Sequence, residues 1–168
     1  MKLSEIYDKH NGKLTCKWSS YIEKYEELFL KYKEKKVNIL EIGVQNGGTL
    51  EIYSKYFKEC QNIIGVDINP KCQNLKYSDD RIKVIIGNIN DNEIKEQILN
   101  FPKFDIIIDD GSHSSQDIIK TFILYYNHLN DDGIYIVEDL HCSYWKEHSG
   151  GLFFPISSIS FFKKIVDI

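Results

Sequence analysis

One apolar run that ends abruptly in polar residues restricts the fold more than any other feature of this sequence. Residues 104–108 are rich in isoleucine and lead directly into Asp109, Asp110, a glycine, a serine and His113. Such a run is typical of a strand buried on both faces of a parallel sheet. Because open α/β sheets bind ligands beyond the carboxyl ends of their strands, we expect chemistry at this end of the run.

Strand and helix patterns alternate along most of the chain. Five short apolar runs predict strands at residues 37–42, 62–66, 82–86, 104–108 and 134–137. Three segments with a partly apolar face predict helices at residues 50–57, 92–99 and 116–129. An Asn-Asp-Asp-Gly sequence at residues 130–133 is expected to end the third helix. The alternation predicts an α/β fold with a doubly wound, mostly parallel sheet.

Both ends of the chain carry helical patterns outside this alternation. Ser20 and Glu23 have the spacing of a capping box, and aromatic residues follow them at helical intervals. We expect residues 1–36 to form a helical cap that packs on the sheet edge or lies over the ligand cleft. Residues 159–168 predict a last helix with no strand after it. We therefore expect that a C-terminal strand pair is missing from this chain.

Composition excludes several classes of protein. The net charge of -4, without a basic stripe, argues against a nucleic-acid partner. The apolar runs are too short to cross a bilayer, and the first residues lack the apolar region of a signal peptide. The four cysteines form no C-x-x-C pair, which argues against a zinc ribbon or redox motif. We expect a cytoplasmic protein that binds neither membrane nor nucleic acid.

A glycine-rich turn follows the first strand. Gly43 lets the chain leave the strand sharply, and Gly47 and Gly48 allow a ligand to approach the backbone closely. The spacing matches neither the G-x-G-x-x-G of dinucleotide sites nor a phosphate-binding P-loop. It suits a nucleoside without a pyrophosphate, although a plain tight turn would use the same glycines.

Asp67 ends the second strand. A carboxylate at this position can accept hydrogen bonds from both ribose hydroxyls of an adenosyl group. The alternative is that it caps a helix, because Pro70 follows soon after.

Taken together, these motifs resemble a known family. The glycine turn, Asp67 and the Phe-Asp-x-x-x-Asp strand at residues 104–109 resemble class I S-adenosylmethionine-dependent methyltransferases. The Asp-Asp-Gly-Ser-His sequence at 109–113, with Val-Glu-Asp-Leu-His at 137–141 and Ser-Tyr-Trp at 143–145, is similar to the macrocin and mycinamicin sugar O-methyltransferases. The resemblance spans most of the chain and implies the Rossmann-like methyltransferase fold. It predicts one domain over residues 1–168, with a cofactor-binding and catalytic core at 37–145 and a C-terminal segment at 146–168.

We assign cofactor binding to residues at the ends of the first four strands. The third strand ends in Asn88, where many relatives carry an aspartate for the adenine amino group, and an asparagine oxygen can still accept that hydrogen bond. For Asp109 a role in capping the following turn stays open. The full predicted set is Glu41, Gly43, Gly47, Asp67, Asn88 and Asp109.

Three carboxylates are predicted to meet where the fourth and fifth strands end. Asp110, Glu138 and Asp139 would repel one another in a cleft, and a divalent cation would remove that cost. Oxygen ligands favour Mg²⁺, and the resemblance implies the same three ligands. A solvated turn at residues 138–139 is the alternative.

The resemblance also implies that His113 is the general base. An imidazole can take the proton of a sugar hydroxyl whose pKa is lowered by bound Mg²⁺. His113 could instead cap the helix that starts near Ser115. His141, Tyr144 and Trp145 are left without an assigned role, with an aromatic platform for a sugar ring and plain core packing as alternatives for the last two.

The sequence thus predicts an S-adenosylmethionine- and Mg²⁺-dependent O-methyltransferase that acts on a saccharide hydroxyl of a small-molecule or glycan acceptor. We also expect a homo-oligomer. Three alternatives stay open: a catechol-type O-methyltransferase, an inactive cofactor-binding fragment and a nicotinamide-dependent oxidoreductase.

Overall fold

The computed structural model describes residues 1–166 and contains a five-stranded sheet. The strand order is β3-β2-β1-β4-β5, and every neighbouring pair is parallel. The strands are β1 (Asn38–Ile42), β2 (Asn62–Asp67), β3 (Ile82–Ile86), β4 (Phe104–Asp109) and β5 (Leu129–Val137). This order confirms the doubly wound parallel sheet, with its switch point between β1 and β4.

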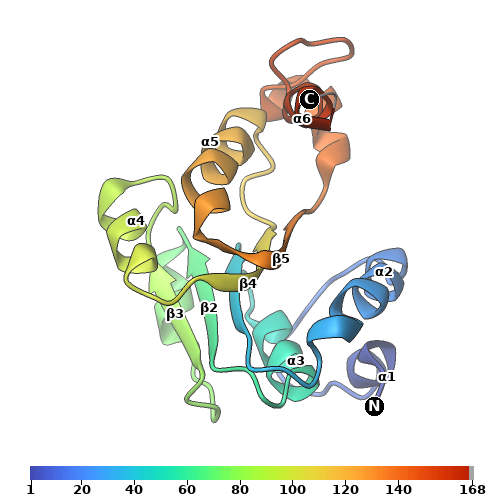
Figure 1. The fold of residues 1–168 in the computed structure, drawn as a ribbon, viewed down its shortest axis with the longest axis vertical. Helices are drawn as coiled ribbons and strands as arrows, with labels where there is room; N and C mark the ends of the chain where they lie inside the picture. Colours follow the sequence, from blue (N-terminus) through green and yellow to red (C-terminus); the bar gives the residue numbers. More distant parts are fainter. Residues whose placement is uncertain (167–168) are drawn as a thin grey trace.

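Helices cover both faces of the sheet (Figure 1). One face carries α1 (Leu3–Asp8), α2 (Ser19–Phe29) and α3 (Gly48–Tyr56), and the other carries α4 (Asn92–Leu99) and α5 (Ser115–Tyr125). α6 (Ser158–Val166) packs against α5. Single 3₁₀ turns are η1 (Leu30–Tyr32), η2 (Pro70–Asn74), η3 (Tyr126–His128), η4 (Leu140–Tyr144) and η5 (Lys146–His148). No helix within residues 1–166 is long and apolar enough to cross a membrane.

The core has two layers because side chains of each strand alternate between the two faces. On β1, Ile39 packs with the aromatic side chains of α2 and α3, and Leu40 packs on the opposite side with α4 and α5. Phe29 joins α2 to α3, with its ring 5.3 Å from that of Phe57 and 6.0 Å from that of Tyr53. Each fully buried side chain of this size contributes about 2 kcal/mol to folding.

The predicted end of the third helix is wrong. The helix predicted at residues 116–129 ends at Tyr125, and β5 begins at Leu129 and includes the turn-forming residues 130–133. These residues join the strand because Leu129 pairs with Phe104 and the Asn130 side chain donates a hydrogen bond to Asp105 at 2.8 Å.

The predicted capping box is also wrong. α2 begins at Ser19, one residue before the predicted cap Ser20, with Trp18 as N-cap and no side-chain cap hydrogen bond. The helix stays in place because Tyr25 and Phe29 are buried in the core. The last helix is confirmed as far as Val166, and residues 167–168 of that prediction lie outside the described residues.

Backbone hydrogen bonds continue past the strand ends and fix the loops there. Gly43 donates to the carbonyl of Val66 at 2.8 Å, and Asp110 donates to that of Ile42 at 2.9 Å. Glu138 donates to the carbonyl of Asp109, also at 2.9 Å. Polar residues that follow β1, β4 and β5 are therefore held at one edge of the sheet.

Candidate active site

A cavity of about 550 Å³ lies at the carboxyl ends of the strands. Residues at the end of each strand or directly after it line the cavity, together with the segment that precedes α2. The charged or imidazole side chains that line it are Lys17, Asp67, Asp109, Asp110, His113, Asp117, Glu138 and Asp139. Its position is the one at which open α/β sheets bind ligands.

Most residues that the sequence analysis singled out meet at this cavity. Gly43, Asp67, Asn88 and Asp109 line it, as do the predicted metal ligands and His113. Glu41 and Gly47 do not line it. The Glu41 carboxyl lies on the face of the sheet that α3 covers, with its Oε1 3.5 Å from the Tyr53 hydroxyl. Gly47 is the N-cap of α3.

The turn after β1 is built around Gly43. Its φ of 93° lies in the left-handed region, and a Cβ atom there would collide with the backbone carbonyl of Asp110. Asp67 holds the same turn from β2, since one carboxylate oxygen accepts the amides of Val44 at 2.8 Å and Gln45 at 2.7 Å. The helix cap considered for Asp67 belongs to Asn69, whose side chain accepts the amide of Lys71.

Asn88 and Asp109 differ in how fully their polar atoms are used. The side-chain oxygen of Asn88 accepts the amide of Asn90 at 3.0 Å. Asp109 is 4% exposed, and one of its oxygens accepts a long hydrogen bond of 3.4 Å from Gly111. The other, Oδ2, has no partner among the described residues. Burial raises the pKa of Asp109 to about 7, against the lowering effect of that bond. Asp109 therefore offers an unused acceptor at the cavity.

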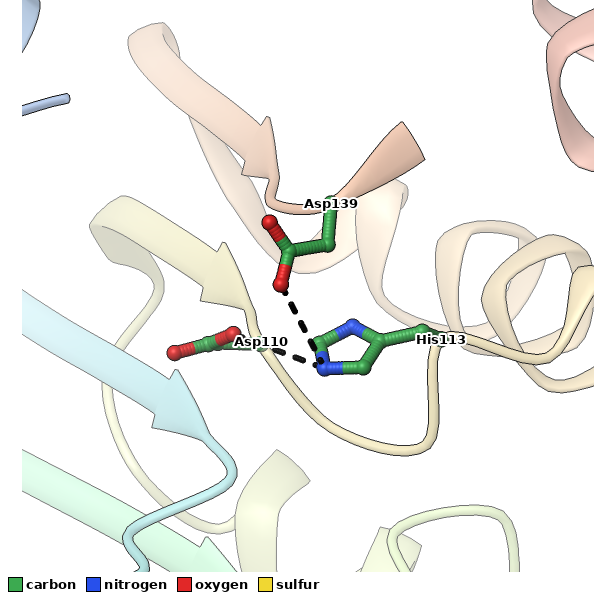
Figure 2. Close-up of side chains that lie close together, drawn as sticks. All are labelled: Asp110, His113 and Asp139. Carbon is green, nitrogen blue, oxygen red and sulfur yellow. Dashed lines mark ion pairs between the residues drawn. The ribbon is translucent and has the colours of Figure 1, made fainter. Parts of the chain in front are cut away.

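Asp110, His113 and Asp139 form a compact group at the ends of β4 and β5 (Figure 2). Each offers one potential ligand atom, and these atoms lie within 4.8 Å of one another. His113 Nε2 is 3.9 Å from Asp110 Oδ1 and 3.8 Å from Asp139 Oδ2. The imidazole points back from its loop into the space between the two carboxylates.

The backbone of this group adopts a conformation that is unusual for side-chain-bearing residues. His113 and Asp139 have φ values of 56° and 52°, in the left-handed region. The N-cap of α5 is Ser114, so His113 does not have the capping role that was considered for it. The solvated turn considered for residues 138–139 is wrong for Glu138, which is 5% exposed.

Glu138 belongs to a second, buried network that the sequence did not indicate. Its Oε1 accepts a hydrogen bond from the Tyr25 hydroxyl at 2.6 Å and contacts the ammonium of Lys17. Lys17 Nζ also lies 2.5 Å from Asp110 Oδ2 and 3.9 Å from Glu41 Oε1. Tyr25 is one of the aromatic residues that the helical spacing after Ser20 included, without a role in the site. Lys17 precedes that helix, and no motif distinguished it.

Burial and charge shift the acid–base equilibria of this network. Burial raises the pKa of Glu41 to about 8, although Lys17 opposes the shift. Burial likewise raises the pKa of Glu138, again against Lys17. For Lys17, burial lowers the pKa, but Glu41, Glu138 and Asp110 outweigh it and hold the pKa above the usual range. The surrounding carboxylates therefore favour the charged ammonium form of Lys17.

Aromatic and imidazole rings after β5 lie beside His113 and Asp139, although they do not line the cavity. The rings of His141 and Trp145 pack edge to face at 5.0 Å, and Trp145 and His113 both lie near His148. His141 Nδ1 is 3.9 Å from Asp139 Oδ1. Trp145 is 49% exposed, so core packing is not its role.

The donor set fits a hard divalent cation and an adenosyl ligand. Asp110 Oδ1 and Asp139 converge, and of the basic residues only His113 lies between them. The two carboxylates can therefore supply the oxygen ligands that Mg²⁺ prefers. The unpartnered oxygen of Asp109 offers an acceptor to a ligand that carries hydrogen-bond donors.

Comparisons with known proteins agree with this arrangement. A family model described as a methyltransferase domain matches residues 40–140. The 8-demethyl-8-alpha-L-rhamnosyl tetracenomycin-C 2'-O-methyltransferase of Streptomyces olivaceus is 31% identical over 90% of this chain and 42% of its own length. Demethylmacrocin O-methyltransferase of Streptomyces fradiae is 31% identical over 88% of this chain and 38% of its own length.

A solved structure is similar over nearly the whole chain. The MycE methyltransferase from the mycinamycin biosynthetic pathway, in complex with Mg, SAH and mycinamycin VI, superposes with a TM-score of 0.86 at 28% identity. The match covers 99% of this chain and 48% of that one, so the chain spans less than half the length of these relatives. The resemblance to sugar O-methyltransferases is confirmed. The chain belongs to the methyltransferase-domain family whose model matches residues 40–140.

Proposed function

We propose that this chain is the cofactor-binding and catalytic part of an S-adenosylmethionine- and Mg²⁺-dependent O-methyltransferase that acts on a saccharide hydroxyl. One observation carries the proposal: the group of Asp110, His113 and Asp139 lines the same cavity as Asp67 and Asn88. In this proposal a base, a cation site and an adenosyl site would share one space. The proteins that it resembles are O-methyltransferases of glycosylated compounds, and one is solved with Mg and SAH.

The cofactor site of the proposal is the half of the cavity along β1, β2 and β3. Asp67 would accept the ribose hydroxyls with the lone pairs left beside its three backbone hydrogen bonds. Asn88 and Asp109 would face the adenine and the amino-acid portion, and Gly43 gives the ligand room to approach the backbone. Gly47 and Glu41 would act through the turn and the floor of the site, because neither lines the cavity.

The catalytic half lies along β4 and β5. Asp110, Asp139 and Glu138 would hold Mg²⁺, with Glu138 the least available because Lys17 and Tyr25 already use one of its oxygens. When bound, Mg²⁺ would make a sugar hydroxyl more acidic, and the sulfonium cofactor would supply the methyl group. His113 would take the hydroxyl proton, and the flanking carboxylates would stabilise the resulting imidazolium.

The remaining assignments follow from the same proposal. The partner is a small-molecule or glycan acceptor, the location is the cytoplasm and the assembly is a homo-oligomer, with no membrane or nucleic acid involved. The single-domain organisation, with residues 1–36 as a cap over the sheet, is part of the proposal, and the contacts of Tyr21 with Asp139 and Tyr25 with Glu138 support it.

A methyl-transfer assay tests the function. Labelled S-adenosylmethionine is incubated with the protein and a panel of acceptors that includes sugar glycosides, nucleotide-linked sugars and catechol, in Mg²⁺ or in chelator. We expect transfer to a sugar in Mg²⁺ only, and Asp110→Asn should reduce it at least tenfold, whereas exposed Asp80→Asn should not. Methylation of catechol alone, or equal rates in chelator and Mg²⁺, would contradict the proposal. Calorimetric binding of NAD without S-adenosylhomocysteine would favour the oxidoreductase.

A further inference from the structure

Lys17 is buried among the carboxylates of the site. Its side chain is 3% exposed, and its ammonium contacts Glu138 Oε1 and lies 2.5 Å from Asp110 Oδ2. Glu41 Oε1 is 3.9 Å away on the other side. Within residues 1–166 no other lysine or arginine forms an ion pair with these three carboxylates. The ammonium can reach water only if the segment before α2 moves.

The charge balance at this place needs a cation even when no metal is bound. Glu138 is almost fully buried, and Asp110 and Asp139 follow at the cavity wall. Carboxylates packed together in a poorly solvated site destabilise the folded chain unless a positive charge compensates them. Tyr25 adds a neutral hydrogen bond to Glu138 but no charge.

Lys17 divides the oxygen atoms of Asp110 into two sets. Oδ2 faces the ammonium, and Oδ1 faces His113 and the group with Asp139. In the same way, Lys17 and Tyr25 share Oε1 of Glu138. The ammonium thus orients both carboxylates and uses the oxygens that would otherwise be open to a metal ion.

We propose that Lys17 is a positioning residue of the cation site, which keeps Asp110 and Glu138 in place in the metal-free protein and weakens divalent-cation binding through its own charge. This inference rests on the proposed function, since it takes Asp110, Glu138 and Asp139 as the ligands. A lysine in this role lets the site keep its shape without metal and keeps bound Mg²⁺ exchangeable.

The affinity for Mg²⁺ alone tests the charge. Lys17→Met keeps the length of the side chain, removes the charge and frees Oδ2 of Asp110, while Oε1 of Glu138 keeps its hydrogen bond from Tyr25. Titration calorimetry of the metal-depleted protein with MgCl₂ should show binding at least tenfold tighter than in the wild type. Lys17→Arg keeps the charge and should stay within about threefold of the wild type. Lys13→Met, which removes a lysine 2.7 Å from Glu51 in the same segment, is the matched control and should leave the affinity unchanged.

Thermal unfolding gives an independent readout. Lys17→Met leaves the carboxylates uncompensated, so its Tm in chelator should fall below that of the wild type, and saturating Mg²⁺ should raise it by more than it raises the wild-type Tm. A variant that folds only in Mg²⁺ supports the proposal in the same way. A variant that is unfolded in chelator and Mg²⁺ alike overturns it, because Lys17 would then be a structural residue only.

The outcomes separate this inference from the proposed function. If the wild type binds Mg²⁺ and Lys17→Met binds it equally or more weakly, the role of Lys17 is wrong and the metal site stands. If neither protein nor any variant binds Mg²⁺, the metal dependence of the proposed function is wrong, and this inference falls with it.

Discussion

At the scale of single residues, the proposed catalysis depends most on His113. Its Nε2 lies between two carboxylates, at 3.9 and 3.8 Å, and its backbone adopts an uncommon conformation to place it there. Strain of this kind persists where the surrounding structure supports it and is common at functional sites. The proposed role as base therefore has a geometric basis in addition to the family resemblance.

Replacement of His113 by glutamine should separate catalysis from binding. The amide keeps a polar side chain but cannot accept the hydroxyl proton, so methyl transfer should fall by about 10²- to 10⁴-fold. Affinity for S-adenosylhomocysteine, measured by calorimetry, should stay within about threefold of the wild type. His128→Gln, which changes a histidine bonded to the carbonyl of Phe101, serves as the control. A near-normal rate in the His113 variant would remove it as the base.

Glu41 predicts a pH dependence of stability. Burial raises its pKa from 4.5 to about 8, so the folded chain favours the protonated form. The stability that this group contributes is complete below pH 4.5 and is lost as the pH rises through about 8. Glu41→Gln replaces the carboxyl with a neutral amide of the same size, which does not ionise. Between pH 5 and 9 the free energy of unfolding of the variant should therefore fall by less than that of the wild type, with a difference on the order of 3 kcal/mol.

Urea unfolding at several pH values measures this difference. Exposed Glu96→Gln is the control and should follow the wild-type pH profile. Parallel pH profiles for Glu41→Gln and the wild type would mean that Glu41 is ionised in the folded chain at neutral pH.

At the scale of elements, the turn after β1 connects the two halves of the cavity. Gly43 touches the backbone of Asp110 so closely that no side chain fits, and its φ is 93°. Gly43→Ala should therefore lower the free energy of unfolding by about 2 kcal/mol or more and weaken Mg²⁺ binding, because it displaces Asp110. Gly151→Ala, whose Cβ would be 3.4 Å from its nearest neighbour, is the control. Equal stability of the two variants would show that the close approach is unimportant.

The strands could be predicted from sequence better than the helix ends. Strand patterns are clear because most residues of β1, β2 and β4 are buried, and each strand has a run of apolar residues at its centre. The end of α5 could not be predicted, because the polar residues 130–133 extend β5 through contacts with β4, far away in sequence. The start of α2 is fixed by tertiary packing rather than by the capping pattern at Ser20.

At the scale of the whole molecule, the parallel topology explains which site residues could be predicted. Carboxyl ends of neighbouring strands meet at one edge, so Asp110 and Asp139 could be placed together from β4 and β5 alone. Lys17 could not, because it lies 93 residues from Asp110 and 121 from Glu138 and follows no periodic pattern. Its place depends on how the segment before α2 packs over the sheet.

A crystal structure with S-adenosylhomocysteine and Mn²⁺, used as an anomalous substitute for Mg²⁺, would locate both proposed ligands in one experiment. We propose that one cavity holds an adenosyl ligand along β1 to β3 and a hard cation where β4 and β5 end. We expect the ribose beside Asp67 and an anomalous peak within ligand distance of both Asp110 and Asp139. An adenosyl group bound elsewhere, or a peak that contacts neither aspartate, would contradict it.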